Sequence, residues 1–364
     1  MTEIKLLILD DDSRVTDSYN EIIKRINRDV ENPLNYKVYT ANTLEQAKEY
    51  IEYNKLDTAV VDLNLCMDTS DSSNADGNRA IEEIMNFFRM PIFIVSGEIH
   101  KLEEKFKKNH LIIPRIRDES VGDVFYTDIP SAYNSKSMQY FSRNGYLEQK
   151  INDFYWNHLE KTLESWSAVA TSHSEEFDTI LSRHTVSCLN EQLYVNGNIG
   201  SFDKYHPGEM YIIPPIKEHY HTGDILKKGE DFFIIINPAC DIVNKVNLDF
   251  YILAKIIDFN SLPKLQEKIK KESIPTDYFY DQLNKDGKNC YADCKSNKKD
   301  RFHYLTKFDK FEEKLIDFQQ IINTTEEDIN LYSREASVSS PFLKDVIARF
   351  SAYYARQGQP NLLL

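Results

Sequence analysis

The strongest constraint on the fold comes from three short apolar runs near the start of the chain, each of which ends in a polar residue. Residues 6–9 are followed by three aspartates, residues 58–61 by Asp62, and residues 92–95 by Ser96. Apolar runs of this length are typical of strands that are buried on both faces of a parallel sheet. Because the carboxyl ends of such strands line the crevice where ligands bind, we expect these polar residues to meet at one sheet edge.

Amphipathic stretches alternate with the apolar runs along the first part of the chain. Thr43 is followed three positions later by Gln46, a spacing typical of a helix N-terminus. The alternation predicts an α/β domain with a flavodoxin-like, doubly wound parallel sheet. The expected strands cover residues 4–9, 36–40, 58–61, 92–95 and 111–117, and the expected helices cover residues 13–28, 44–54, 78–88 and 99–108.

The aspartates at the expected sheet edge form a candidate metal site. Asp10, Asp11 and Asp62 bring together negative charge that is costly unless a cation neutralises it. Carboxylate oxygens with few other protein ligands suit Mg²⁺. With the metal bound, Asp62 is a candidate nucleophile toward a phosphoryl group, and Ser96 is a candidate partner for the phosphoryl oxygens. The alternative is a flavodoxin-like domain whose acidic edge is only solvated.

Up to about residue 118, the sequence resembles the receiver domain of two-component response regulators. Such domains carry an acidic pair after the first strand, a phosphoacceptor aspartate after the third and a Ser or Thr after the fourth. The pair Asp10-Asp11, Asp62 and Ser96 match these positions. The resemblance implies that Asn64 offers its backbone carbonyl to the metal, and that the phosphoryl group comes from a sensor histidine kinase or a kinase-like partner protein.

The sequence departs from the receiver pattern at two places. A polar insert, residues 67–74, separates the third strand from the Asp76-Gly77 pair that opens the next helix, and we interpret it as a mobile loop or a flap over the site. The Lys-Pro pair that receivers place after the fifth strand is absent, and Arg115 or Arg117 is there instead. We take Arg117 as the candidate, although its planar guanidinium differs from the point charge of a lysine.

At 364 residues, the chain is long enough for two or three domains. We predict a receiver-like domain over residues 1–120, a helical connector over residues 121–190, and an α+β effector domain of unknown type over residues 191–364. Apolar residues in the connector recur close to one helical face, which indicates either a homodimer interface or a core helix. These residues are Leu147, Ile151, Phe154, Leu159, Leu163, Trp166 and Ala170.

The C-terminal half has a different pattern, with strand signals near residues 211–215 and 222–226 and apolar strands at residues 231–237 and 250–257. Gly223-Asp224-Ile225 before apolar strands resembles, loosely, the small SH3-like barrel of the toxin family of messenger-RNA endonucleases. We therefore include a small β-barrel among the expected forms of this domain. The expected helices cover residues 262–272, 307–323 and 341–356.

Two groups of residues in this half are candidates for chemistry. Cys240 and Asp241 lie in a polar turn after the most apolar strand, where a nucleophile or a metal ligand with a carboxylate partner would be placed. His219 and His221 share one face of an expected extended strand and are candidate bases or metal ligands. A structural cysteine and two structural histidines are the competing interpretation.

Two further features of this half are a candidate zinc loop and a candidate basic surface. Cys290 and Cys294, with His303 beyond them, have the spacing of a zinc loop, but no fourth ligand is evident nearby. A basic cluster is either a surface for RNA or an acidic partner, or a solvated loop. It consists of Lys285, Lys288, Lys295, Lys298, Lys299 and Arg301.

Composition limits the classes of partner and compartment. The formal net charge of −14 argues against nucleic acid as the main partner, because phosphate contacts need concentrated Lys and Arg. No apolar run has the length of a membrane span and no signal peptide is evident, so we expect a cytoplasmic protein. Five scattered cysteines fit reduced thiols.

Together these features favour a response-regulator-like signalling protein, in which Asp62 accepts a phosphoryl group with Mg²⁺ and thereby switches a C-terminal effector. Fold-level analogy places such proteins in bacterial conflict or phage-defence systems. One alternative is a nuclease or hydrolase in the C-terminal half, gated by the receiver and using Cys240, Asp241 or the histidines His219 and His221. The other is a pseudo-receiver scaffold without phosphorylation. The sequence leaves open whether the protein is an enzyme.

Overall fold

The computed structural model describes residues 2–65, 76–118, 121–141, 145–194, 205–245, 248–258 and 301–355. The chain divides into two compact units, residues 1–201 (unit 1) and residues 202–364 (unit 2). Among the described helices, none is long and apolar enough to cross a membrane. Four predicted features lie outside the described residues: the insert at 67–74, the helix at 262–272, the pair Cys290 and Cys294, and the lysines of the basic cluster.

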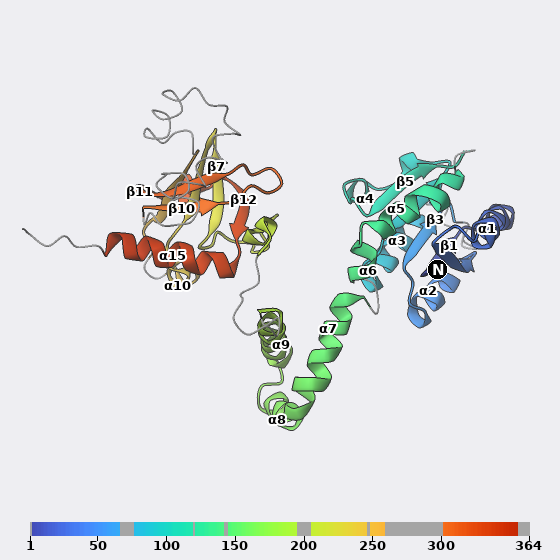
Figure 1. The fold of residues 1–364 in the computed structure, drawn as a ribbon, viewed down its shortest axis with the longest axis horizontal. Coiled ribbons are helices and arrows are strands. Elements are labelled where there is room, and N and C mark those ends of the chain that lie inside the picture. Colours follow the sequence, from blue (N-terminus) through green and yellow to red (C-terminus); the bar gives the residue numbers. More distant parts are fainter. Residues whose placement is uncertain are drawn as a thin grey trace, which may run out of the picture. The chain divides into compact units, whose positions relative to one another are not determined.

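Unit 1 contains a five-stranded parallel sheet in the order β2-β1-β3-β4-β5 (Figure 1). This is the order of the flavodoxin-like doubly wound fold, whose switch point lies between β1 and β3. The predicted fold class of this part is therefore confirmed. The strands are β1 (Thr2–Leu9), β2 (Leu34–Ala41), β3 (Thr58–Val61), β4 (Ile92–Ser96) and β5 (Ile112–Ile116).

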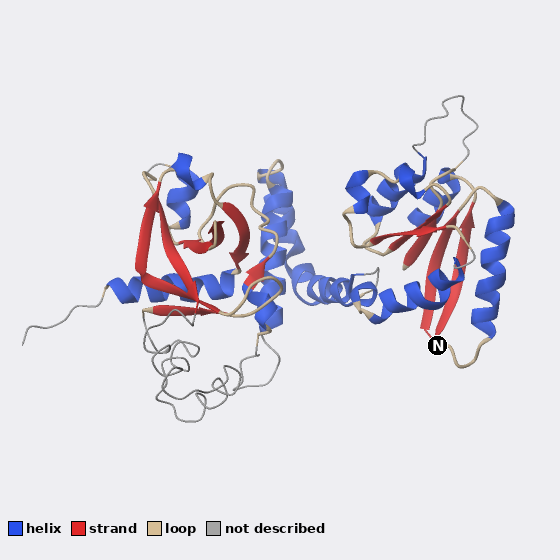
Figure 2. Ribbon diagram, turned by 90° about the horizontal axis from the view of Figure 1, so that it is seen from above, coloured by secondary structure: helices blue, strands red, loops and turns tan. Residues whose placement is uncertain are grey.

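Helices cover both faces of this sheet (Figure 2). α2 (Leu44–Tyr53) and α3 (Asp76–Phe87) pack on one face, and α1 (Ser13–Arg28) packs on the other. The second face is also covered by the helical segment that comprises η3 (Val124–Asp128) and α5 (Ile129–Asn134). Because this segment is buried against the sheet, the packing of unit 1 continues past the predicted boundary at residue 120.

Side-chain caps explain where two of the helices begin. The carboxylate of Asp12 accepts the backbone N–H of Arg14 at the start of α1. The hydroxyl of Thr43 accepts the backbone N–H of Gln46 at the start of α2, so this predicted cap is confirmed. Each cap satisfies a backbone donor that the helix itself leaves without a partner.

The single helix predicted over residues 99–108 is wrong. The chain instead forms a short 3₁₀ turn, η1 (Ile99–Lys101), and one helical turn, α4 (Glu104–Lys107). The side chain of Asn78 accepts the backbone N–H of Glu103 at 3.1 Å and donates to the carbonyl of Lys101 at 3.1 Å. These bonds engage backbone groups that a continuous helix would pair internally, so the helix is interrupted.

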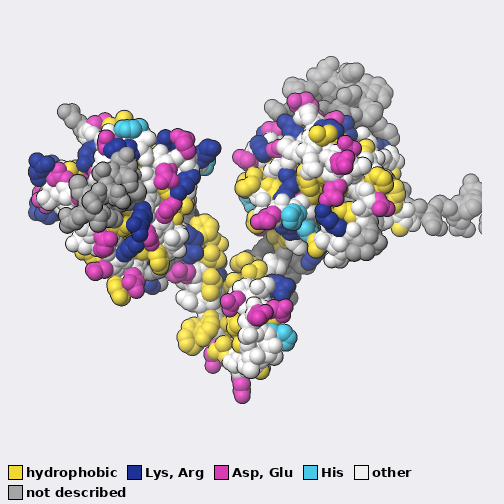
Figure 3. Space-filling model, turned by 180° about the vertical axis from the view of Figure 1, so that it is seen from behind, with side chains coloured by type: hydrophobic (Ala, Val, Ile, Leu, Met, Phe, Trp, Pro, Cys, Tyr) yellow, Lys and Arg dark blue, Asp and Glu magenta, His cyan; other side chains and the backbone are white. Residues whose placement is uncertain are grey.

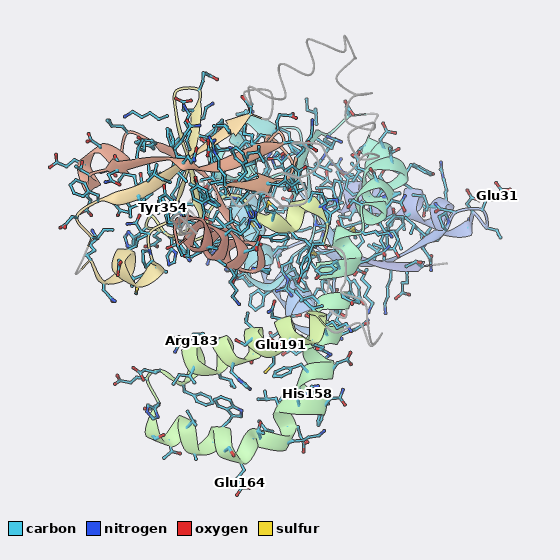
Figure 4. The ribbon with its side chains drawn as sticks, turned by 60° about the vertical axis from the view of Figure 1, so that its left-hand side comes forward. Glu31, His158, Glu164, Arg183, Glu191 and Tyr354 are labelled. Carbon is cyan, nitrogen blue, oxygen red and sulfur yellow. The ribbon has the colours of Figure 1, made fainter. Side chains whose placement is uncertain are left out.

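A helical segment completes unit 1 and includes most of the predicted connector. It consists of α6 (Ser137–Phe141), α7 (Tyr146–Phe154), η4 (Tyr155–Leu159), η5 (Glu160–Thr162), α8 (Leu163–Ser172) and α9 (Phe177–Tyr194). Helix α9 contacts α7, and Figure 4 shows Glu164 on α8 with Arg183 and Glu191 on α9. The Trp166 ring lies 4.7 Å from the His184 ring, centroid to centroid, which joins α8 to α9.

Unit 2 contains a seven-stranded antiparallel sheet that curls into part of a barrel, in the order β10-β11-β9-β8-β7-β12-β6. The curled sheet agrees with the α+β class and the partial barrel expected for this half. Its strands are β6 (Tyr211–Ile212), β7 (Asp224–Lys228), β8 (Asp231–Ile235), β9 (Tyr251–Asp258), β10 (Phe302–Leu305), β11 (Lys314–Thr324) and β12 (Ser333–Val338).

Helices also cover both faces of the curled sheet. α15 (Ser340–Tyr354) packs on one face, where Val346 is completely buried among apolar strand residues. α10 (Ala239–Asn244) and α14 (Glu326–Ile329) pack on the other face through Ile242 and Ile329. The short helix η6 (Pro207–Met210) precedes β6.

The helix predicted over residues 307–323 is wrong, because most of this segment is strand β11. β11 pairs with β9, but the register shifts between Asp317 and Ile321. The shift breaks the two-residue alternation by which a strand is recognised. The carboxylate of Asp317, completely buried at this shift, accepts hydrogen bonds from the Arg301 guanidinium and from the Gln319 backbone N–H.

Candidate functional site

The carboxyl edge of the parallel sheet brings the predicted residues of unit 1 together. Asp10 follows β1, Asp62 follows β3, Ser96 ends β4, and Arg117 follows β5. Leu9 pairs with Val61, so the residues that come next on β1 and β3 are neighbours. The crevice at this edge is where doubly wound sheets bind ligands.

Three carboxylates form the centre of the site. Asp10, Asp11 and Asp62 each place an oxygen within 4.8 Å of the others. The Asp10 and Asp62 side chains are 2% and 5% exposed, so water neutralises little of their charge. One oxygen of Asp62, Oδ1, is buried and has no hydrogen-bond partner among the described residues.

This arrangement fits a divalent cation of the Mg²⁺ type. The three carboxylate oxygens lie within 4.8 Å of one another, oxygen is the donor type that a hard cation prefers, and the buried Oδ1 of Asp62 has no hydrogen-bond partner among the described residues. The Asn64 side chain accepts a hydrogen bond from Lys101 at 3.3 Å, and the metal contact of its backbone carbonyl stays a prediction. Asp12, the third aspartate of the run, caps α1 instead.

Burial controls the ionisation of Asp10. Desolvation raises the pKa of this carboxyl from 3.8 to about 6, although the Asp12 N–H and the Arg117 guanidinium act in the opposite direction. Repulsion from Asp62 and Asp11 adds to the rise. Asp10 therefore keeps its proton to a higher pH than an ordinary aspartate, because its pKa is raised.

We expect the metal-free protein to lose stability as the pH rises from about 4 to about 7, by roughly 2 kcal/mol from Asp10. A carboxyl whose pKa is raised in the folded state binds its proton more tightly there than in the unfolded chain. Its stabilising effect is therefore present below the unfolded pKa and is lost as the pH rises through the folded value of about 6. Chemical denaturation of wild type and Asp10→Asn with EDTA, over a pH series, measures the difference. A difference that does not change with pH would contradict this expectation.

Arg117 is the basic residue that lies against the acidic cluster. Its Nη2 lies 2.5 Å from Asp10 Oδ2 and 3.0 Å from Asp62 Oδ2, and it donates to the carbonyl of Val95 at 3.2 Å. Arg115 forms a two-pronged ion pair with Asp128, with contacts of 2.7 and 3.0 Å. Of the two arginines, only Arg117 has a contact with the acidic cluster among the described residues.

Ser96 is completely buried at the end of β4, and its hydroxyl accepts the backbone N–H of Glu98 at 3.3 Å. The sequence prediction missed Lys101, which lies on the turn after Ser96. Its ammonium forms a 2.5 Å ion pair with Glu98 and bonds Asn64. The only sequence signal for Lys101 was its three-residue spacing from Glu98, which is common on surfaces.

Gly77 lets α3 begin against the residues around Asp62. A Cβ atom at this position would lie 2.4 Å from the Leu63 Cα and 2.6 Å from the Asp62 carbonyl oxygen. Both neighbours are backbone atoms, so no side chain can move aside to make room. The Asp76-Gly77 pair therefore sets the closeness of α3 to the acidic cluster.

The candidates in unit 2 occupy two different surroundings. Cys240 is exposed on α10, and its Sγ lies 3.5 Å from Asp241 Oδ1. His219 and His221 do not lie on an extended strand, so that expectation is wrong. Arg334 donates to the carbonyls of Lys217 and Glu218 and thereby holds the backbone of this segment in an irregular path.

A groove of about 730 Å³ lies on the surface of unit 2. Both histidines line it together with Lys217, Tyr251 and Arg334, whereas Cys240 and Asp241 are not among its lining residues. No cluster of metal-ligating side chains that includes either histidine occurs in the described part of the chain. Roles for Cys240, Asp241, His219 and His221 thus remain predictions.

No family model matches the chain, and no curated protein matches it. Solved structures match about a third of it. The N-terminal domain of a response regulator/sensory box/GGDEF protein from Carboxydothermus hydrogenoformans is 18% identical over 36% of this chain and 94% of its own, with a TM-score of 0.29. A CheY-like receiver domain protein from Methanospirillum hungatei JF-1 is 20% identical over 37% and 96%, also with a TM-score of 0.29.

A third solved structure, the BeF3-activated N-terminal receiver domain of RstA from Klebsiella pneumoniae, is 14% identical over 35% of this chain and 97% of its own, with a TM-score of 0.26. The strand order and the residues at the sheet edge define the class of unit 1 independently of these alignments. Unit 1 contains a flavodoxin-like, doubly wound α/β domain with an acidic cluster at the carboxyl edge of its sheet.

Proposed function

We propose that unit 1 accepts a phosphoryl group on Asp62 while Mg²⁺ is held by Asp10, Asp11, Asp62 and the backbone carbonyl of Asn64. The observation that carries this proposal is the convergence of three carboxylates at the sheet edge, with Asp62 Oδ1 buried and unpartnered. When bound, Mg²⁺ would neutralise the charge that builds up between the carboxylates and an incoming phosphoryl group.

The chain's own residues have separate roles in this reaction. A carboxylate oxygen of Asp62 attacks the phosphorus of a phosphohistidine, an O–P bond forms, and the P–N electron pair returns to the imidazole of the donor. The Arg117 guanidinium stabilises the phosphoryl oxygens on one side. The Ser96 hydroxyl, now paired with the Glu98 N–H, donates to a phosphoryl oxygen on the other.

The proposed donor is a sensor histidine kinase or a kinase-like protein, since the reaction needs an activated phosphoryl group. The proposed output is a change in unit 2, transmitted through the helices after α5. A role in bacterial conflict or phage defence stays a prediction by analogy, because no contact of the described residues bears on it.

Homodimerisation through these helices is part of the proposal. Of the predicted apolar stripe, Phe154 and Leu159 are buried, but Ile151 and Leu163 are exposed, as is Trp156 beside them. Figure 3 shows apolar side chains gathered along this helical segment. Exposed apolar surface on a helix pair is typical of a contact with another chain.

Incubation of the purified chain with Mg²⁺ and a small phosphoryl donor, followed by intact-mass spectrometry, tests the proposal. We expect a mass increase of one phosphoryl group in wild type and none in Asp62→Asn. Light scattering on the same samples reports whether the phosphoryl group changes the oligomeric state. Equal labelling of both proteins would contradict the assignment of Asp62, and no labelling of either would favour a scaffold without phosphorylation.

A further inference from the structure

Arg117 contacts the oxygens that the metal would need. Its Nη2 lies 2.5 Å from Asp10 Oδ2 and 3.0 Å from Asp62 Oδ2. The other oxygen of Asp10, Oδ1, accepts the Asp12 N–H at 3.0 Å. Both oxygens of Asp10 are therefore engaged within the chain, whereas Asp62 keeps Oδ1 without a hydrogen-bond partner.

The charges explain why the guanidinium adopts this position. Asp10 and Asp62 are almost completely buried, and the Arg117 side chain is 28% exposed. Buried carboxylates that lie side by side need a counter-charge, and Arg117 supplies one from within the chain. A second cation at the same oxygens would meet repulsion from the guanidinium.

We propose that Arg117 masks Asp10 in the metal-free protein and competes with Mg²⁺ for the acidic cluster. The inference rests on the proposed function of this site and adds its regulation. Mg²⁺ binds only when the guanidinium leaves Asp10 Oδ2, while the Val95 carbonyl and Asp62 Oδ2 keep Arg117 close to the position of the phosphoryl oxygens. The same side chain thus opposes metal binding and then stabilises the phosphoryl group.

The competition predicts that removing Arg117 tightens metal binding. We expect Arg117→Ala and Arg117→Gln to bind Mg²⁺ at least about tenfold more tightly than wild type in calorimetric titrations, because a neutral residue leaves Asp10 Oδ2 free. Without metal, both variants should melt at a lower temperature than wild type. Adding Mg²⁺ should raise the melting temperature of both variants by more than it raises that of wild type. Arg117→Gln retains the aliphatic stem and a polar, uncharged end, in case the alanine variant folds poorly.

Arg115→Ala is the matched control, since Arg115 lies two residues earlier, in β5, and pairs with Asp128 rather than with the acidic cluster. It should bind Mg²⁺ as wild type does. Equal affinities for wild type and both Arg117 variants would overturn the competition while leaving the proposed function intact. If neither wild type nor any of the variants binds Mg²⁺, both the competition and the proposed function are overturned.

Discussion

Gly77→Ala is expected to destabilise unit 1 by roughly 3 kcal/mol and to weaken metal binding. The new Cβ would lie 2.4 Å from the Leu63 Cα and within 2.7 Å of two carbonyl oxygens. Relief requires that α3 moves away or that the backbone after Asp62 shifts. Since the Asn64 carbonyl belongs to that same backbone, a backbone shift would also distort the proposed metal site.

Urea denaturation monitored by hydrogen exchange of β1 and β3 peptides measures this effect in unit 1 alone. Gly97→Ala is the matched control, because a Cβ at Gly97 meets nothing within 4 Å. The control should change stability by less than about 0.5 kcal/mol. If Gly77→Ala and Gly97→Ala lower the free energy of unfolding of unit 1 by similar amounts, Gly77 is not needed for the close approach of α3.

Asn237→Ala is expected to destabilise unit 2 by roughly 2 to 4 kcal/mol. The buried Asn237 amide donates to the carbonyl of Phe250 at 2.9 Å and accepts the N–H of Ile252 at 2.6 Å. It thereby joins the end of β8 to the start of β9. Alanine would remove the partner of both backbone groups, which lie just before and within the start of β9 in partly buried surroundings.

Cys240→Ala and Asp241→Ala in the following helix, α10, provide the comparison. Both side chains lie at or near the surface, so each should cost less than about 1 kcal/mol of unfolding free energy. Hydrogen exchange of β8 and β9 peptides during denaturation distinguishes the three variants. If Asp241→Ala lowers the free energy of unfolding of unit 2 as much as Asn237→Ala does, the structural role assigned to Asn237 is contradicted.

The parallel sheet and its acidic edge could be predicted from the sequence because a strand that is buried on both faces has a continuous apolar run. Four-residue apolar runs predicted three of the strands, and the topology rule placed Asp10, Asp62 and Ser96 at one edge. The predicted start and end of α1 and β3 agree with the structure. These signals are local, so they do not depend on contacts with distant parts of the chain.

Other features depend on contacts that no local pattern records. The choice between Arg115 and Arg117 was open because Asp128, the partner of Arg115, lies on a helical segment whose place was unknown. The path around His219 depends on Arg334, more than a hundred residues away. In β11 the register shift at Asp317 disrupted the alternation, so the segment was interpreted as a helix.

Binding of beryllofluoride in the presence of Mg²⁺ tests the central claim most directly, because this complex mimics a phosphoryl group on a carboxylate. We expect saturable binding to wild type and to Asp12→Asn, whose altered residue caps α1 and lies outside the acidic cluster. Asp62→Asn should bind none. Binding that persists in Asp62→Asn, or a wild-type protein that binds Mg²⁺ but no beryllofluoride, would contradict phosphoryl acceptance on Asp62.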